Sequence, residues 1–335
     1  MVDTRRCANP RVIVTRELPD EVMDRLEALF DTRNNRADRA MTRAELAAAM
    51  AECDVLVPTV TDTIDAELIA GAGERLKLIA NFGAGVNHID LKAARARGII
   101  VTNTPGVLTE DTADMTMALI LSVPRRLAEG EKLVRSGQWT GWSPGGMLGH
   151  RIAGKALGII GMGRIGQGIA RRGAYGFGMK VIYHNRSRLD AALEAECKAA
   201  YVGKEELLKT ADHVVLVVPY TPASHHTIGA AEIALMKPTA TLVNIARGGI
   251  VDDAALAVAL REKRIAAAGL DVFEGEPKLN PELLKVPNVV LTPHIASATV
   301  PTRRAMADLA VDNLIGYLVH DKPVTPLNPA VLATR

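Results

Sequence analysis

Short apolar runs alternate with longer helical patterns along almost the whole chain. A first series of apolar runs stands at 11–14, 53–57, 76–80 and 98–103, with helical spacing between them at 20–30, 42–51 and 64–72. A second series stands at 156–161, 180–185, 213–219, 240–246 and 266–272. Strands without polar alternation are typical of parallel sheets that helices cover on both faces. The sequence therefore predicts an α/β protein with two doubly wound parallel sheets.

Two proline-containing joints separate these series, "TNTPG" at 102–106 and "LTPHIAS" at 291–297. A last helical stretch at 301–319 follows the second joint. We expect the chain to enter a second domain at the first joint and to return at the second. The substrate domain would then be discontinuous, 1–103 plus 293–335, and the dinucleotide-binding domain would be 104–292. A cleft between two such domains is a favoured place for a ligand.

The composition excludes several classes of protein. Lys and Arg number 40 against 38 Asp and Glu, and aromatic residues make up only 3%, which argues against a nucleic-acid partner. No apolar run approaches the roughly 18 residues that span a membrane. The three cysteines, Cys7, Cys53 and Cys197, form no CxxC motif, so neither a disulfide framework nor a metal site is expected. These features predict a cytoplasmic protein.

A glycine-rich turn lies between the strand predicted at 156–161 and the helix that follows it. In a G-x-G-x-x-G turn the first Gly permits the tight turn, the second admits a pyrophosphate and the third lets helix and strand pack closely. The helix N-terminus adds free N–H groups and a positive dipole end. We therefore predict a dinucleotide site here, and its residues are Gly161, Met162, Gly163, Arg164, Ile165 and Gly166.

The segment "HNRSR" at 184–188 indicates which dinucleotide is bound. NAD-binding turns place an acidic residue about 20 positions further on, where it binds the ribose 2′-hydroxyl. Asn185 stands near that position here, and Arg186, Ser187 and Arg188 follow it. An arginine can bind a 2′-phosphate that a carboxylate would repel. The segment predicts NADP(H), with NAD(H) as a weaker cofactor, although a solvated loop would also explain the arginines.

Three residues after predicted strands suit the reduction of a carbonyl group. Arg247 can bind a carboxylate, and His294 with Glu276 would form a proton donor whose ring the carboxylate orients. Each has an ordinary alternative role. Arg247 could cap a strand end, Glu276 could lie in a solvated turn, and His294 could be a hinge residue. Spacing alone leaves these alternatives open.

Four segments in the same order resemble the signature segments of the D-2-hydroxyacid dehydrogenases: "GIIGMGRIGQGIA", "NIARGGIVDDAAL", "AGLDVFEGEP" and "LTPHIASAT". The resemblance extends over nearly the whole chain and includes "NFGAGVNHID" at 81–90. It implies two Rossmann-like domains with Arg247 binding the substrate, His294 as general acid and Glu276 as its partner. It also implies that the backbone N–H groups of Ala84 and Gly85 bind the substrate carboxylate.

Further site contacts are expected around these residues. Ser297 is expected to contact substrate, and the expected cofactor contacts outside the glycine turn and "HNRSR" are Thr109, Pro219, Ile245, Asp271 and His294. The segment "SGQWTGW" at 136–142 resembles the glyoxylate/hydroxypyruvate reductases. That resemblance implies that Trp142 reaches into the active site of a second subunit, with a dimerisation arm around 108–150.

Together these observations predict a homodimeric enzyme that uses NADPH to reduce glyoxylate or hydroxypyruvate to the D-2-hydroxy acid. His294 would be its proton donor. Two alternatives remain open. One is a reductase of bulkier 2-oxo acids, and the other is a non-catalytic co-repressor that senses nicotinamide nucleotides.

Overall fold

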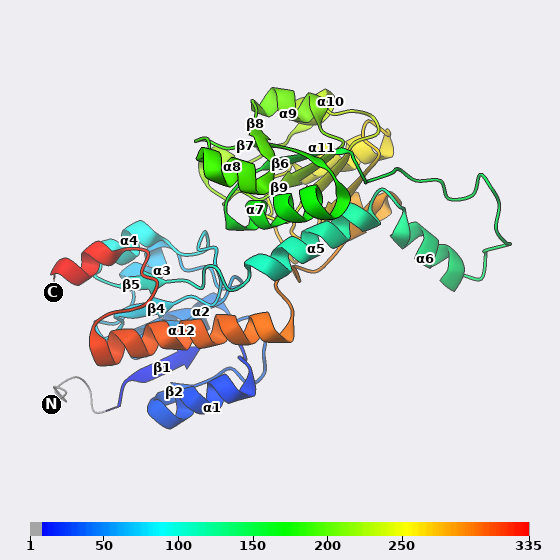
Figure 1. Cartoon of the computed structure of the whole chain (residues 1–335). Coiled ribbons are helices and arrows are strands. Elements are labelled where there is room, and N and C mark those ends of the chain that lie inside the picture. Colours follow the sequence, from blue (N-terminus) through cyan, green and yellow to red (C-terminus); the bar gives the residue numbers. More distant parts are fainter. Residues whose placement is uncertain (1–8, 335) are drawn as a thin grey trace. The chain divides into compact units, whose positions relative to one another are not determined.

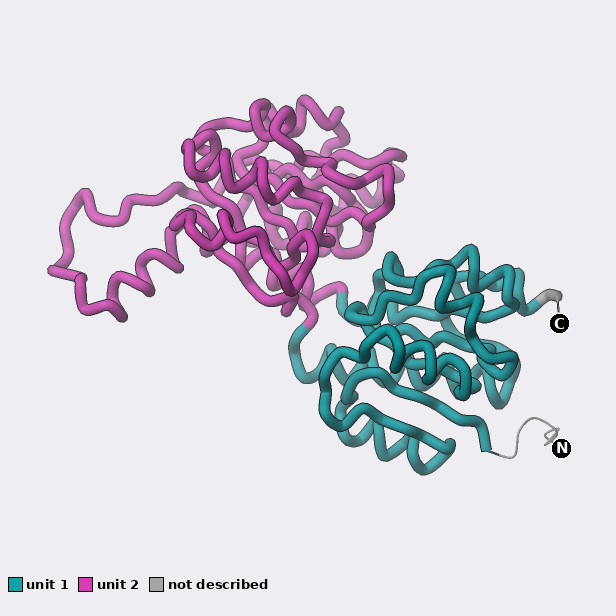
Figure 2. Tube along the Cα trace, turned by 180° about the vertical axis from the view of Figure 1, so that it is seen from behind, with its two compact units in different colours: residues 1–108, 298–335 teal, residues 109–297 magenta. Residues whose placement is uncertain are grey.

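The computed structural model describes residues 9–334, and Cys7 lies outside the described residues. The chain divides into two compact units, which Figure 2 colours separately. Unit 1 comprises the residues up to Leu108 and those from Ala298 onward, and unit 2 is Thr109–Ser297. The sequence placed both crossings five residues earlier, after 103 and after 292. As a result, His294 belongs to unit 2, whereas the sequence placed it in the substrate domain.

Unit 1 is a five-stranded parallel sheet in the order β2-β1-β3-β4-β5 (Figure 1). Its strands are β1 (Arg11–Val14), β2 (Asp31–Arg33), β3 (Val55–Val57), β4 (Leu78–Ala80) and β5 (Ile100–Thr102). Its helices are α1 (Asp20–Leu29), α2 (Arg43–Glu52), α3 (Ala66–Ala70), α4 (Leu91–Ala96) and α12 (Val300–His320), with the short η4 (Pro329–Thr334). This is the strand order of a flavodoxin-like unit.

Apolar clusters cover both faces of the unit 1 sheet. One cluster joins β1 and β3 to α1 and α12, and its members include Val12, Leu26 and Leu314. The other cluster includes Leu46 of α2 and Ile69 of α3. Strands that are buried on both faces need apolar side chains at successive positions. This requirement explains why Val12, Ile13 and Val14 stand in one run.

Unit 2 is a seven-stranded parallel sheet in the order β12-β11-β10-β9-β6-β7-β8. Its strands are β6 (Ala156–Ile160), β7 (Lys180–His184), β8 (Ala199–Tyr201), β9 (His213–Leu216), β10 (Thr241–Asn244), β11 (Ala267–Leu270) and β12 (Val289–Leu291). Counted from β6, this order is the 3-2-1-4-5-6 arrangement of a Rossmann sheet with one further strand. The prediction of two doubly wound parallel sheets is confirmed.

Helices cover both faces of this second sheet. They are α5 (Thr109–Ser122), α7 (Arg164–Arg171), α8 (Ala191–Cys197), α9 (Lys204–Thr210), α10 (Ala230–Leu235) and α11 (Asp253–Arg261). Unit 2 also contains α6 (Leu127–Arg135), which has no buried residue. Shorter helical turns are η1 (Arg172–Gly176), η2 (Pro222–Ser224) and η3 (Leu283–Lys285). Among residues 9–334, no helix is both long enough and apolar enough to span a bilayer.

Residues 108–150, where the sequence predicted an arm, fall into two parts. Helix α5 belongs to the core of unit 2, because its side chains Ala113, Leu119 and Ile120 are buried. From Leu127 to His150, by contrast, no residue is buried. Helix α6 and the chain after it extend away from the rest of unit 2 (Figures 1 and 2).

Candidate functional site

The predicted site residues of unit 2 gather at one edge of its sheet. The glycine turn follows β6, Asn185 follows β7, Arg247 follows β10, Asp271 follows β11 and His294 follows β12. All strands are parallel, so their carboxyl ends meet at the same edge. Open α/β sheets bind ligands at this edge, beside the point where the strand order reverses. Here the order reverses between β6 and β9.

The glycine turn fits a dinucleotide. A Cβ at Gly161 would lie 2.6 Å from the carbonyl oxygen of Val217, and one at Gly166 would lie 2.3 Å from that of Gly161. A Cβ at Gly163 would instead meet no described atom within 4 Å. Gly163 is the N-cap of α7 and makes no side-chain cap. The first and third glycines are thus required by packing, while the second leaves the helix N-terminus open to a phosphate.

Asn185 takes part in shaping this turn. Its Oδ1 accepts a hydrogen bond from the backbone N–H of Met162 at 2.7 Å. An amide oxygen thus supports the turn without bringing a negative charge to the end of β7. The two residues that follow, Arg186 and Ser187, are exposed and make no hydrogen bond or ion pair with the described residues.

Arg188 is engaged differently from Arg186. Its Nε and Nη2 donate to the two carboxylate oxygens of Glu194 at 2.9 and 2.7 Å. Tyr183 also donates to Glu194, at 2.7 Å. The hydrogen bonds from Arg188 and Tyr183 lower the pKa of Glu194 to about 2. The sequence motifs did not predict this pair, because a spacing of six residues between Arg188 and Glu194 is not a local signal of contact.

Arg247 lies in a loop that the end of β10 holds in place. The amide of Asn244 accepts from the N–H of Ala246 at 3.1 Å and donates to the carbonyl of Arg247 at 3.2 Å. A Cβ at Gly248 would lie only 1.7 Å from the carbonyl oxygen of Phe273. The glycine after Arg247 therefore lets this loop pack directly against the turn that begins at Phe273. Burial lowers the pKa of Arg247, and the charge of Glu276 opposes this effect.

The structure brings Glu276 and His294 together. Nδ1 of His294 lies 2.7 Å from Oε1 of Glu276, and the other carboxylate oxygen accepts from the N–H of Phe273 at 3.2 Å. Burial by itself would raise the pKa of Glu276. The hydrogen bond and charge of His294, the Phe273 N–H and the charge of Arg247 outweigh burial, so the pKa is lowered. Glu276 is thus held as a carboxylate beside the ring.

Asp271 fixes the backbone on both sides of His294. Its fully buried carboxylate accepts from the hydroxyl of Thr292 at 2.6 Å and from the N–H groups of Ile295 and Ala296 at 2.9 Å. His294 itself has a φ of 56°, a left-handed conformation that is costly for a residue with a Cβ and is found at functional sites. The bonds to Asp271 hold the backbone on either side of His294 despite this strain.

In unit 1, the side-chain amides of Asn81 and Asn103 hold the loop around Ala84 and Gly85 by hydrogen bonds to its carbonyl oxygens. Asn81 donates to the carbonyls of Gly83 and Gly85 at 2.9 and 3.1 Å, and Asn103 donates to that of Ala84 at 2.7 Å. The N–H groups of Ala84 and Gly85 have no acceptor within residues 9–334. Successive free N–H groups form an anion-binding concavity. The roles of Asn81 and Asn103 were not predicted.

The remaining predicted residues differ in how far they are buried. Thr109 begins α5 and contacts the position where a Cβ on Gly168 of α7 would lie. Ile245 is buried, Pro219 is exposed and Ser297 is half-buried at the end of unit 2. Trp142 lies on the chain after α6 with 83% of its surface exposed.

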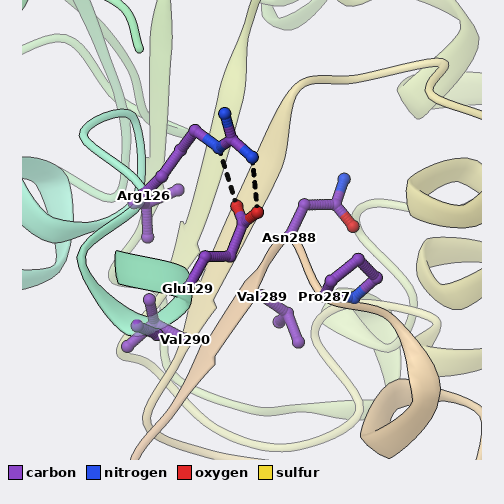
Figure 3. Close-up of a pocket in the computed structure, with 8 residues that line it drawn as sticks. Arg126, Glu129, Pro287, Asn288, Val289 and Val290 are labelled. Atoms are coloured by element: carbon purple, nitrogen blue, oxygen red, sulfur yellow. Dashed lines mark hydrogen bonds and ion pairs between the residues drawn. The ribbon is translucent and has the colours of Figure 1, made fainter. Parts of the chain in front are cut away.

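A small, open depression lies at the base of α6 and contains none of the predicted site residues (Figure 3). Arg126 and Glu129 line it, and Nε and Nη2 of Arg126 donate to the carboxylate of Glu129 at 3.0 and 2.7 Å. Arg126 is also the N-cap of α6. The pair therefore fixes the first turn of the helix where it leaves the core of unit 2.

A Rossmann sheet with an open glycine turn defines unit 2 as a dinucleotide-binding domain, and comparisons with known proteins agree. Residues 117–296 match the family model of the D-isomer specific 2-hydroxyacid dehydrogenase, NAD binding domain. A glyoxylate reductase of Thermococcus litoralis is 47% identical over 329 residues, which cover 97% of this chain and 98% of that protein.

Two solved structures are also similar over nearly their full lengths. A glyoxylate reductase from Paecilomyes thermophila is 32% identical with a TM-score of 0.86, over 95% of this chain and 99% of that one. An NADPH-dependent glyoxylate/hydroxypyruvate reductase from Sinorhizobium meliloti, in complex with NADP and malonate, is 36% identical with a TM-score of 0.84, over 95% and 97%. The chain belongs to the D-isomer specific 2-hydroxyacid dehydrogenase family. It is an NAD(P)-dependent, glyoxylate reductase-like member.

Proposed function

We propose that this enzyme uses NADPH to reduce glyoxylate or hydroxypyruvate to the D-2-hydroxy acid. The observation that supports this most directly is the His294–Glu276 pair, 2.7 Å apart, at the sheet edge where Arg247 also lies. The similar glyoxylate reductases support the substrate class, and the NADPH-dependent reductase from S. meliloti supports the cofactor.

The proposed chemistry needs one hydride and one proton. A bound nicotinamide supplies the hydride to the 2-oxo carbon. Arg247 binds the carboxylate and the oxo oxygen of the substrate through its guanidinium group. His294, with Nδ1–H donated to Glu276, presents Nε2–H to the oxo oxygen and protonates it as the new C–H bond forms. Glu276 stabilises the imidazolium and fixes the ring orientation.

Unit 1 contributes the second contact to the substrate carboxylate in this proposal. The free N–H groups of Ala84 and Gly85 are suited to a carboxylate, because each can donate one hydrogen bond to an anionic oxygen. We further propose that Ser297 contacts the substrate. Thr109, Pro219, Ile245 and Asp271 are proposed to line the cofactor site with the glycine turn.

We propose NADPH over NADH on the basis of charge at the end of β7. Arg186 and Ser187 are exposed there and make no bond to the described residues. Asn185 adds no negative charge. The carboxylate of Glu194 offsets the charge of Arg188 and accepts both of its hydrogen bonds. Arg186 is therefore the arginine that is free to bind a 2′-phosphate.

We also propose a homodimer in which Trp142 of one subunit lines the substrate pocket of the other. The exposed arm supports this, since Leu148 and Trp142 are large apolar side chains without cover. A cytoplasmic location is proposed as well. It fits the thiols of Cys53 and Cys197, which are buried and free of disulfides.

The decisive experiment measures kcat and kcat/KM for glyoxylate and hydroxypyruvate with saturating NADPH. Glu276→Gln keeps the shape of the side chain and removes the carboxylate that accepts from the ring of His294. It should lower kcat, because the ring loses the charge that orients it and stabilises the imidazolium. His294→Ala should lower turnover by roughly 10²–10⁴-fold.

KM for NADPH serves as the internal control and should stay nearly constant in both variants. A wild-type kcat in Glu276→Gln would exclude Glu276 as the partner of the proton donor. A wild-type protein that binds NADPH but turns over no 2-oxo acid would indicate a nucleotide sensor instead.

A further inference from the structure

A second group of polar side chains lies outside the proposed active site. His225 and His226 follow the turn η2 in the loop after β9, and Glu274 follows β11. One ligand atom from each residue lies within 4.8 Å of the other two. The two rings stack with centroids 3.7 Å apart, and Nε2 of His226 lies 3.1 Å from Oε2 of Glu274. A ring nitrogen of each histidine and one carboxylate oxygen therefore lie close together on the surface of unit 2.

The other nitrogen of each ring already has a neighbour. Nδ1 of His225 lies 3.2 Å from the hydroxyl of Tyr220, and Nδ1 of His226 lies 3.9 Å from a carboxylate oxygen of Asp252. Metal-binding histidines commonly direct their second nitrogen to such a partner, which fixes the ring and its tautomer. The hydroxyl of Tyr220 can orient the ring of His225 in this way, whereas the 3.9 Å contact between His226 and Asp252 is too long for a hydrogen bond.

The backbone holds both parts of the cluster in place. The N–H of His226 donates to the carbonyl of Gly249 at 2.7 Å, and the N–H of Glu274 donates to Asp253 at 3.0 Å. His226 has a φ of 49°, which is strained for a residue with a Cβ. Because the backbone is fixed, only side-chain rotations are needed to bring the three ligand atoms to bonding distance.

We propose that His225, His226 and Glu274 bind one divalent first-row transition cation of the Zn²⁺ or Co²⁺ type. Imidazole nitrogens suit these ions, whereas Ca²⁺ and Mg²⁺ prefer sites made of oxygen alone. His225 and Glu274 are exposed, so water can complete the coordination. The cation would tie the loop after β9 to the turn Phe273–Glu276, which also holds the partner of His294.

The test uses the full-length protein without a histidine tag, stripped of metal and free of substrate and cofactor. Isothermal titration with Zn²⁺ and the visible absorption of Co²⁺ should both show one site per chain. Glu274→Gln should weaken binding at least tenfold, and the double variant His225→Asn/His226→Asn should abolish it. Tyr220→Phe should weaken binding by about tenfold, the lower end of what loss of a ring-orienting partner costs.

His150→Asn is the matched control, because His150 is an exposed histidine on the arm, and it should bind as the wild type does. Circular dichroism melts verify that each variant is folded. The proposal is overturned if the double variant binds Co²⁺ as tightly as the wild type. A thiolate charge-transfer band would also overturn it, because it would place the ion on a cysteine. So would a wild type that binds no ion, leaving His226 and Glu274 as a surface ion pair.

Discussion

Asn81 is a fully buried side chain that makes three hydrogen bonds at the end of β4. It donates to the carbonyls of Gly83 and Gly85, and its Oδ1 lies 2.9 Å from Nε2 of His88. Asn81→Ala should release the loop that presents the N–H groups of Ala84 and Gly85. The two hydrogen bonds to the loop are worth about 1 kcal/mol each, so KM for glyoxylate should rise about thirtyfold. Steady-state kinetics should show a smaller change in kcat.

If Asn81 had only a structural role, Asn81→Ala would lower the thermal stability and would leave the ratio of KM for glyoxylate to KM for NADPH unchanged. KM for NADPH is therefore measured in parallel and should stay constant. Asn34→Ala, which removes a surface amide that donates to Glu27, is the matched control. Equal increases in KM for glyoxylate and for NADPH would count against the proposed role of the loop.

Arg186 and Arg188 should differ in their effect on cofactor choice. Arg188 is held by two hydrogen bonds to Glu194, whereas Arg186 is free to bind a 2′-phosphate. Arg186→Ala should raise KM for NADPH about ten- to hundredfold, since a charged hydrogen bond contributes roughly 1.5–3 kcal/mol. Arg188→Ala should have the smaller effect. Steady-state KM values for NADPH and NADH test both variants, and an equal loss for the two cofactors would contradict the assignment.

At the scale of elements, the arm after α6 is the segment whose role is most open to test. Light scattering should give the molar mass of a dimer for the wild type, because the exposed apolar side chains of the arm need a partner surface. Trp142→Ala should change the preference between glyoxylate and hydroxypyruvate while leaving KM for NADPH nearly unchanged. Trp139→Ala, an exposed Trp three residues earlier, is the matched control. A monomer with unaltered preference would rule out the proposed contact.

The elements that the sequence predicted well are those with long apolar runs. The strands β1, β6, β7 and β10 were anticipated from the apolar runs that contain them. All of them except β7, in which Lys180 is exposed, are buried at nearly every position. The strands β2, β8 and β12 were missed. Each has only three residues and lies at the edge of its sheet. The equally short β3 and β4 were predicted, because they lie inside the sheet of unit 1 and all their residues are buried and apolar. The strand β2 (Asp31–Arg33) is also polar. Its hydrogen bonds to β1, rather than its side chains, define it.

The candidate site shows the same limit. Local motifs located the glycine turn, Arg247 and the turn around Glu276, because each lies within a few residues of a strand end. Contacts between distant segments had no local signal. The packing of Gly248 against Phe273 and the approach of His226 to Glu274 depend on which strands become neighbours. The order of strands in the sheet is a tertiary property.

At the scale of the whole molecule, His213 should make stability depend on pH. The ring is buried at the start of β9, with Nδ1 2.8 Å from the hydroxyl of Thr241. Burial lowers its pKa from 6.5 to about 4. Between these values the unfolded chain binds a proton that the folded chain does not. The contribution of His213 to the free energy of unfolding is therefore fully present above pH 6.5, and it is lost as the pH falls toward 4.

Urea denaturation at pH 7 and pH 5 measures this effect. The wild type should lose about 2 kcal/mol from His213, because each pH unit of differential proton binding is worth about 1.4 kcal/mol. His213→Asn should be less stable at pH 7 but should lose less on acidification. His320→Asn replaces an exposed histidine in the last turn of α12 and should retain the wild-type loss. An identical loss in His213→Asn would show that another group is responsible.

The division of the chain also determines the order in which it can fold during synthesis. Helix α12 buries Ala307, Val311 and Leu314 against the sheet of unit 1, yet it is made only after all of unit 2. At roughly 5–20 residues per second, the ribosome needs about 10–40 s to synthesise the intervening ~190 residues. During that time the nascent strands β1, β3 and β4 lack the cover of α12. Unit 2 is continuous and can fold first, so we expect a chaperone to meet the exposed sheet of unit 1 on the ribosome.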